Sequence, residues 1–177
     1  MNLIVAVDQN WAIGNNNELL NRIPEDMKFF QSTTTGKAVI MGRKTLESFP
    51  NGIPLPNRKN IVISSNPNYK VKGATVVPSV EAALEAVSDY DTEDIYVIGG
   101  ERIYRQMLPY CDVAHVTKID HAYAADAWFP SLDLDDEWQI VAESEERTYF
   151  DLEYSFVLYV RKRSMEAMAH YIRRHCQ

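Results

Sequence analysis

The sequence has little that could cross-link the chain or span a membrane. It contains only two cysteines, Cys111 and Cys176, whose spacing matches no zinc or redox motif, so we expect no metal site. No apolar run approaches the roughly 20 residues of a transmembrane helix. A short apolar run at the N-terminus ends at Asp8 with no basic region before it, which predicts a strand and not a signal peptide. These absences favour a cytoplasmic protein with no membrane partner.

Positive charge is also scarce. Lys and Arg number 18 against 25 Asp and Glu, and the formal net charge is −7. A protein that binds nucleic acid needs a basic stripe to neutralise phosphates, so this composition argues against such a partner. Any anionic ligand must therefore be held by a few local cations. With 177 residues, 46% of them hydrophobic, the chain is expected to fold as a single domain.

Apolar runs and amphipathic segments alternate through most of the chain. The runs that predict strands are Leu3–Val7, Ala38–Met41, Asn60–Ser64, Thr75–Val77, Ile95–Ile98 and Val113–Ile119. The segments that predict helices are Pro24–Thr33, Lys44–Ser48, Val80–Val87 and Glu101–Leu108. Two later segments, 138–145 and 154–162, alternate in the antiparallel manner. We predict an α/β fold with a mixed, mainly parallel β-sheet, helices on both faces and an antiparallel C-terminal hairpin.

The segment 95–104 is the most informative stretch of the chain. Its apolar, β-branched run ends in the paired glycines Gly99 and Gly100, and a helical pattern follows. Paired glycines let the backbone bend sharply and approach a ligand closely, because no Cβ stands in the way. Backbone N–H groups at the start of the following helix suit a phosphate. The segment alone is equally typical of a plain strand-to-helix turn.

Polar residues follow other predicted strands as well. In open α/β sheets, ligands lie beyond the carboxyl ends of the strands. The run Gly42-Arg43-Lys44-Thr45 follows the second strand, and Ser64-Ser65 follows the third. The guanidinium of Arg43 suits a phosphate monoester because its fork donates two hydrogen bonds. This repetition favours a phosphorylated ligand, and the alternative is a solvated basic helix start.

Asp26 is the carboxylate with the most informative surroundings. It lies in the first turn of a predicted helix, with apolar Met27 and Phe30 beside it. An acidic residue in a first turn is favourable with the helix dipole and needs no further function. The functional alternative is a partly desolvated carboxylate that pairs with a protonatable heterocycle.

Taken in order, these residues form an ordered set of motifs from residue 1 to about residue 163. The set is Ala6, Ile13-Gly14, Leu19, Pro24-x-Asp26, Phe30, Val39–Thr45, Leu55–Asn60, Ser64-Ser65, Val97–Gly100 and Thr117-x-Ile119. It resembles the dihydrofolate reductase family. The resemblance implies a monomeric enzyme of one-carbon metabolism that reduces 7,8-dihydrofolate to tetrahydrofolate by hydride transfer from NADPH. It also implies binding of antifolate inhibitors.

The resemblance implies a substrate site around two catalytic residues. Asp26 would bind the pterin ring and favour protonation of its imine, and Thr117 would hydrogen-bond that carboxylate. Arg58 would clamp the α-carboxylate of the glutamate moiety. The other implied substrate contacts are Val5, Met27, Phe30, Phe49 and Leu55.

The resemblance also implies the residues that bind NADPH. Those that cover the nicotinamide would be Ala6, Ile13, Gly14, Asn15, Asn16, Asn17, Glu18, Leu19 and Leu20. Those at the adenosine 2′-phosphate would be Arg43, Ser64 and Ser65. Those along the pyrophosphate and its surroundings would be Gly42, Lys44, Thr45, Ile98, Gly99, Gly100, Glu101, Arg102, Ile103 and Tyr104. A cis peptide bond is implied between Gly99 and Gly100.

Three positions depart from the family pattern. Leu20-Asn21 stands where the family usually has Pro-Trp. In the family this pair affects the closure of the loop and the affinity for ligands. Ala125-Asp126 replaces a common glycine before the acidic residue, and a residue is inserted around Pro50-Asn51-Gly52. Two other functions therefore stay open: a related reductase of a pyrimidine intermediate in riboflavin synthesis, and a non-catalytic binder of pterins or nucleotides.

The last segment lies beyond the motifs. Residues 164–177 are helix-permissive and basic at Arg173 and Arg174. We expect residues 1–163 to form the dihydrofolate reductase-like domain. The segment 164–177 is expected to be an appendage whose deletion leaves catalysis nearly intact.

Overall fold

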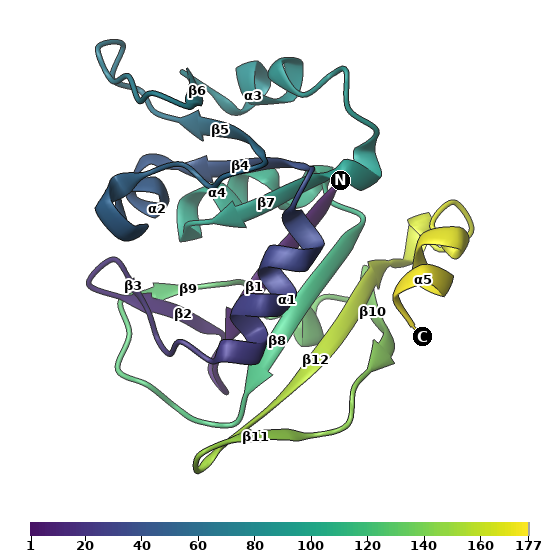
Figure 1. Cartoon of the computed structure of the whole chain (residues 1–177). Helices are drawn as coiled ribbons and strands as arrows, with labels where there is room; N and C mark the ends of the chain where they lie inside the picture. Colours follow the sequence, from purple (N-terminus) through teal and green to yellow (C-terminus); the bar gives the residue numbers. More distant parts are fainter. Residues whose placement is uncertain (177) are drawn as a thin grey trace.

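The computed structural model describes residues 1–176. The fold is built around a central sheet of nine strands (Figure 1). The strands are β1 (Asn2–Val7), β4 (Ala38–Gly42), β5 (Lys59–Ile63), β6 (Ala74–Val77), β7 (Ile95–Gly99), β8 (Val113–Ile119), β10 (Trp138–Glu143), β11 (Arg147–Tyr149) and β12 (Leu152–Arg161). Their order is β10-β12-β8-β1-β7-β4-β5-β6, and β11 pairs with β12. Pairing is parallel from β8 to β6, and β12 is antiparallel to both β8 and β10. The predicted mixed, mainly parallel sheet with its C-terminal hairpin is confirmed.

Helices cover both faces of this sheet. The α-helices are α1 (Pro24–Thr34), α2 (Arg43–Glu47), α3 (Val80–Ala86), α4 (Glu101–Met107) and α5 (Ala169–His175). Short 3-10 helices are η1 (Pro50–Gly52), η2 (Thr92–Asp94), η3 (Leu108–Tyr110), η4 (Leu132–Leu134) and η5 (Lys162–Ser164). All predicted strands and α-helices are present, and none of their ends differs from the prediction by more than two residues.

The core lies on both sides of the sheet because successive strand residues point to opposite faces. On β1, Leu3 and Val5 belong to the core cluster that contains residues of α3 and α4. Ile4 belongs to the other main cluster, against which Phe29 and Phe30 of α1 pack. Burial on both faces explains why these strands appear in the sequence as continuous apolar runs.

A second sheet of three strands was not predicted. It consists of β2 (Ala12–Asn15), β3 (Glu18–Leu19) and β9 (Ala127–Trp128), in the order β3-β2-β9. A two-residue turn joins β2 to β3, with positive φ at both Asn16 (50°) and Asn17 (61°). Asparagine tolerates this conformation, so the asparagine run was the signal for a hairpin.

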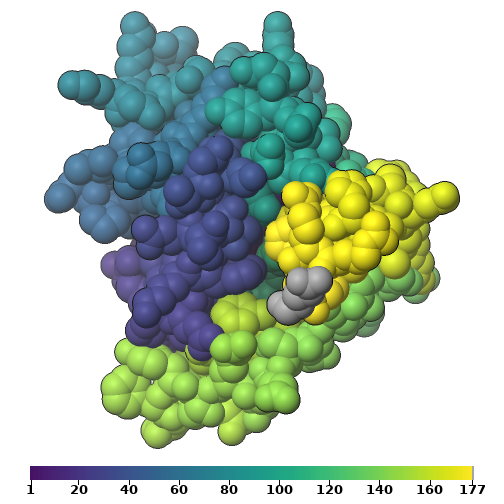
Figure 2. All heavy atoms as spheres, turned by 45° about the vertical axis from the view of Figure 1, so that its right-hand side comes forward, coloured from purple at the N-terminus to yellow at the C-terminus, as the bar shows by residue number. Residues whose placement is uncertain are grey.

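The C-terminal segment folds back onto the sheet and lies beside α1 (Figure 2). Tyr171 of α5 is only 1% exposed, and it packs with Val113, Leu158 and Val160. Helix α5 lies within this helix-permissive segment, and its docking on the sheet is a finding that the sequence did not indicate. No helix within residues 1–176 is long and apolar enough to cross a membrane.

Candidate active site

A cavity of about 1130 Å³ opens at the carboxyl ends of the parallel strands β1, β4, β5, β6 and β7. Cavities of roughly 300–1,000 Å³ hold most small ligands, so this one is large enough for a dinucleotide. All residues expected at the cofactor line it except Asn16 and Leu20. Asn16 lies in the exposed β2–β3 turn, where its backbone N–H donates to Asp126 Oδ2 at 3.0 Å.

Other residues line the same cavity without having been anticipated. They are Ser48, Ile63, Asn66, Pro78, Ser79, Val80, Glu81, Gln106, Tyr110, Asp126 and Ala127. Pro78 and Ser79 follow β6 directly, so the rule that ligands lie beyond strand ends could have located them. Asp126 and Ala127 lie at the start of the distant strand β9, which no local sequence pattern indicated.

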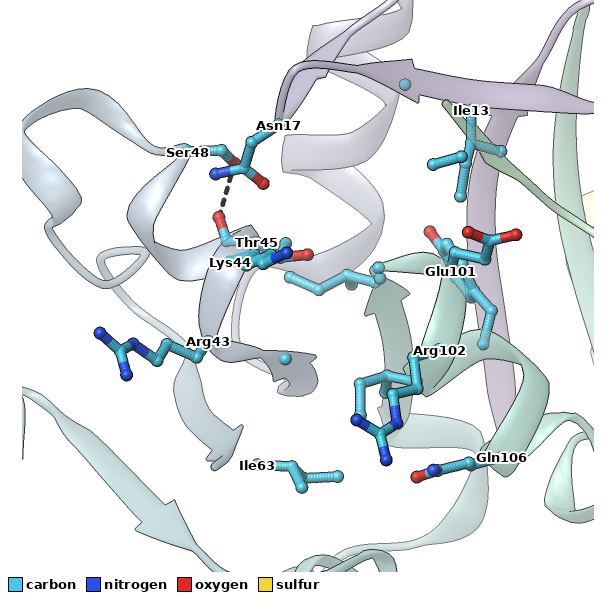
Figure 3. A pocket seen from close by; sticks show the side chains of 18 of the residues that line it. Ile13, Asn17, Arg43, Lys44, Thr45, Ser48, Ile63, Glu101, Arg102 and Gln106 are labelled. Atoms are coloured by element: carbon cyan, nitrogen blue, oxygen red, sulfur yellow. Dashed lines mark hydrogen bonds between the residues drawn. The ribbon is translucent and has the colours of Figure 1, made fainter. Parts of the chain in front are cut away.

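Cations enter the cavity from two different helices. Arg43 and Lys44 come from α2, and Arg102 comes from α4 (Figure 3). The hydroxyl groups of Thr45, Ser64 and Ser65 add donors on the same lining. This donor set suits a ligand that carries several phosphates.

The backbone at the end of β7 approaches α2 closely. The peptide bond between Gly99 and Gly100 is cis, as the resemblance implied, and Gly99 has φ of 131°. A Cβ atom on either glycine would lie 3.3 Å from Thr45 Oγ1. Glycine therefore avoids a tight contact with α2 at both positions, and because both glycines line the cavity, a ligand can approach their backbone.

The small sheet closes one side of the cavity. Asp126 ties the β2–β3 hairpin by accepting from Asn16 and by donating its own N–H to Gly14 O at 3.1 Å. Asn21, where the family usually has Trp, donates from Nδ2 to the Tyr123 hydroxyl at 3.0 Å. The departures from the family pattern thus coexist with an ordered, hydrogen-bonded loop.

Asp26 meets Thr117 beside this cavity. Thr117 Oγ1 on β8 donates to Asp26 Oδ1 at 2.6 Å. Burial raises the pKa of the Asp26 carboxyl, and the Thr117 hydrogen bond opposes that increase. Thr117 is paired in register with Ala6 of β1, which lines the cavity. The carboxylate site and the cavity are therefore adjacent across one pair of strands.

Neighbouring residues hold Asp26 in place. Pro24 occupies the first position of α1, where its missing N–H is no loss. Glu25 binds Arg147 through one carboxylate oxygen and accepts from the Tyr154 hydroxyl at 2.5 Å through the other. The first turn of α1 is thereby anchored to β11 and β12.

The expected substrate residues gather between α1 and the loop before β5. Phe30, Phe49 and Leu55 are partly buried against one core cluster, and Met27 is 39% exposed. Among the expected substrate contacts, Val5 is the one that also lines the large cavity. The expected substrate contacts therefore adjoin the large cavity at β1.

Arg58 reaches this region from a loop that Asn60 organises. The buried Asn60 side chain accepts from Leu55 N at 3.0 Å and donates to Leu55 O and Arg58 O at 2.9 and 3.1 Å. The Arg58 guanidinium lies 5.8 Å from the centre of the Phe30 ring and donates to Thr35 Oγ1 at 3.2 Å. Its Nε is buried and has no hydrogen-bond partner among residues 1–176. Burial lowers the pKa of this guanidinium.

A cavity of dinucleotide size, lined by cations and hydroxyl groups that suit phosphates and placed next to a buried carboxylate, is typical of an enzyme that uses a nucleotide cofactor. Comparisons with known proteins give the family. The family model described as dihydrofolate reductase matches residues 1–161. The chain belongs to the dihydrofolate reductase family, whose members reduce dihydrofolate with NADPH.

Individual relatives cover nearly the whole chain. Dihydrofolate reductase of Bacillus subtilis is 39% identical over 171 residues, covering 94% of this chain and 98% of its own. The enzyme of Neisseria meningitidis serogroup A is 41% identical over 160 residues, covering 90% and 96%. The structure of Enterococcus faecalis dihydrofolate reductase complexed with NADP(H) and RAB-propyl superposes with a TM-score of 0.81 at 32% identity, covering 91% of this chain and 95% of that one.

Proposed function

We propose that this chain reduces 7,8-dihydrofolate with NADPH through the residues gathered around Asp26 and the large cavity. The observation that carries the assignment of roles is the 2.6 Å hydrogen bond between Thr117 and Asp26. It holds a carboxylate of raised pKa next to a cavity of dinucleotide size. The family supports the reaction, and the geometry supports these particular residues.

The cavity fits NADPH by the chemistry of its lining. Arg43, with Ser64 and Ser65, would hold the 2′-phosphate, and Lys44, Thr45 and the turn after β7 would hold the pyrophosphate. Gly99 and Gly100 line the cavity without a Cβ, so their backbone would be free to contact the cofactor. When bound, NADPH supplies the hydride. The protein supplies position and electrostatics.

Asp26 acts on the substrate by charge. Its carboxylate accepts hydrogen bonds from the pterin amino group and ring N–H, and it stabilises the substrate protonated at the imine nitrogen. Hydride attack on the adjacent carbon is easier once that nitrogen carries a proton, which solvent can deliver. Thr117 orients the carboxylate, and Phe30 packs on the substrate rings.

Arg58 would bind the other end of the substrate. Its Nη1 group donates to no residue among 1–176, and the α-carboxylate of the glutamate moiety would provide an acceptor. The pterin and the carboxylate would then be held on opposite sides of Phe30, above which the Arg58 guanidinium already lies. Antifolates that carry a diaminopyrimidine or pterin would pair with Asp26 in the same way.

We also propose that the protein acts as a cytoplasmic monomer on small molecules and not on nucleic acid, with residues 1–163 as its catalytic domain. The net charge of −7 supports the absence of a nucleic-acid partner. The boundary at residue 163 is supported by the position of the proposed site residues, all of which precede residue 118. Size-exclusion chromatography with light scattering tests the monomer, and a dimer would contradict it.

A steady-state assay tests the reaction. NADPH consumption is followed with dihydrofolate, with the pyrimidine intermediate of riboflavin synthesis, and with no second substrate. We expect turnover with dihydrofolate only. Turnover with the pyrimidine alone would favour the related reductase, and binding of NADPH without any turnover would favour a non-catalytic protein.

A further inference from the structure

We propose that Tyr69 determines cofactor specificity by positioning the Arg43 guanidinium for the 2′-phosphate. This inference rests on the proposed function, in which Arg43 binds that group. The two residues come from different segments: Arg43 begins α2, and Tyr69 lies in the loop between β5 and β6. The Arg43 guanidinium carbon lies 4.7 Å from the centre of the Tyr69 ring. A guanidinium at this distance is attracted to the face of an aromatic ring.

The loop that carries Tyr69 is folded by its own hydrogen bonds. Asn66 N donates to Ser64 Oγ at 3.3 Å, and Asn68 N donates to Asn66 Oδ1 at 3.0 Å. Tyr69 N then donates to Asn66 O at 3.2 Å. These bonds fold the loop after Ser64, an expected phosphate contact, so that Tyr69 lies next to the Arg43 side chain. The Tyr69 ring is anchored from behind, because it packs against a core cluster of the main sheet.

A second contact sets the direction of the guanidinium. Arg43 Nε donates to Glu47 Oε1 at 2.7 Å, one turn further along α2. Among residues 1–176, no acceptor is hydrogen-bonded to either Nη group of Arg43. The Glu47 bond therefore occupies one edge of the guanidinium and leaves the edge with both Nη groups for a ligand. The Tyr69 ring then sets the plane in which these groups point.

The location fits a group at the end of the dinucleotide. Figure 3 shows the Arg43 guanidinium on the outer side of the cavity, away from Glu101 and Arg102. The 2′-phosphate is present in NADPH, and a neutral hydroxyl replaces it in NADH. A residue that acts by orienting Arg43 toward this phosphate should therefore affect the binding of NADPH and leave that of NADH unchanged.

The inference is tested by measuring the binding of NADPH and of NADH to the unmodified protein and to four variants. The variants are Tyr69→Ala, Tyr69→Phe, Arg43→Ala and the double variant Tyr69→Ala/Arg43→Ala. Titration followed by protein fluorescence or calorimetry gives each dissociation constant. We expect Tyr69→Ala to weaken NADPH binding by about two- to fivefold, the range of an exposed cation–π contact, with NADH unchanged. Tyr69→Phe retains an aromatic face and should bind NADPH as the unmodified protein does.

The double variant distinguishes positioning from independent contact. If Tyr69 acts through Arg43, Tyr69→Ala should cause no further loss once Arg43 is alanine. Equal weakening of both cofactors by Tyr69→Ala, or full additivity in the double variant, would overturn the inference. Arg43→Ala tests the proposed function separately: equal loss of NADPH and NADH there would show that Arg43 does not bind the 2′-phosphate. A selective loss in Arg43→Ala, with no effect of Tyr69→Ala, would overturn the role of Tyr69 alone.

Discussion

Thr117 Oγ1 donates a 2.6 Å hydrogen bond to Asp26 Oδ1, although the two residues are 91 positions apart in the chain. The bond joins the central sheet to the first turn of α1. It stabilises the ionised carboxylate where burial favours the protonated form. The pKa of Asp26 is therefore set by two opposing effects, burial that raises it and the Thr117 hydrogen bond that lowers it.

Replacing Thr117 by valine should shift this balance. The variant keeps the shape of the side chain and loses the donor, so the pKa of Asp26 should rise. A hydrogen bond to a charged group is worth about 1.5–3 kcal/mol, so its loss should raise the kinetic pKa measurably. The pH profile of kcat/KM measures this change, and Thr117→Ser is the matched control that retains a hydroxyl. An unchanged profile in Thr117→Val would show that the bond does not tune Asp26.

Removal of the Arg58 guanidinium should weaken substrate binding selectively. In Arg58→Met, the KM for dihydrofolate should rise by about tenfold or more, because a charged hydrogen bond is lost. Stability should fall only slightly, since the Arg58–Thr35 hydrogen bond is exposed and the buried Nε has no partner among residues 1–176. A dihydropterin substrate that lacks the glutamate moiety serves as the control. Equal loss for both substrates would argue against a carboxylate contact.

The C-terminal segment should contribute to stability. The Tyr171 hydroxyl is hydrogen-bonded to the Tyr96 hydroxyl and to His115 Nε2, both at 2.8 Å. Tyr96 and His115 lie on β7 and β8, the strands on either side of β1. Burial, with the nearby His175, lowers the pKa of His115 to about 3, so this histidine is neutral at physiological pH.

Tyr171→Phe should therefore lower the free energy of unfolding by about 1–3 kcal/mol, because two buried polar groups lose their partner. Urea denaturation measures the loss, and kcat should remain near that of the unmodified enzyme. Tyr149→Phe is a matched control, because no described residue is hydrogen-bonded to the Tyr149 hydroxyl. Deletion of residues 164–177 should likewise lower the free energy of unfolding and leave kcat nearly unchanged. Equal effects of the two tyrosine variants would contradict this account.

The ionised carboxylate of Asp26 should lower the free energy of unfolding of the protein at neutral pH. Its folded pKa is raised, so the folded state binds the proton more tightly than the unfolded chain does. The free energy of unfolding attributable to this group therefore falls as pH rises above about 4, the unfolded pKa, towards the raised folded value. Asp26→Asn should unfold at higher urea than the unmodified protein at neutral pH, and the difference should disappear in acid. A variant destabilised equally at both pH values would contradict the direction of this pKa.

The main fold could be predicted because its strands are buried on both faces. Such strands form continuous apolar runs, and Val113–Ile119 was located to the residue. The three-stranded sheet was missed because β3 and β9 have two residues each, and β9 comes from a distant segment. The docking of Tyr171 was missed because its partner Tyr96 lies 75 positions away. Local patterns do not encode such pairings.

The site could be predicted in part for a similar reason. The rule of strand ends located Arg43, Ser64 and Gly99 from their positions in the sequence. The roles of Arg58 and Thr117 came from the family resemblance, because neither residue has a distinctive local pattern. Asn60, which holds the Arg58 loop, looked like an ordinary strand residue, and only its three side-chain hydrogen bonds show its role.

The central claim is that the Asp26 carboxylate promotes hydride transfer by stabilising protonated dihydrofolate. The most direct test is the rate of that transfer in a single turnover, measured against pH for the unmodified enzyme and for Asp26→Asn with NADPH bound. We predict that the variant is slower by about a hundredfold or more at neutral pH and recovers partly in acid, where protonated substrate is present in solution. NADPH binding should be unchanged. Equal rates of hydride transfer at neutral pH would contradict the account.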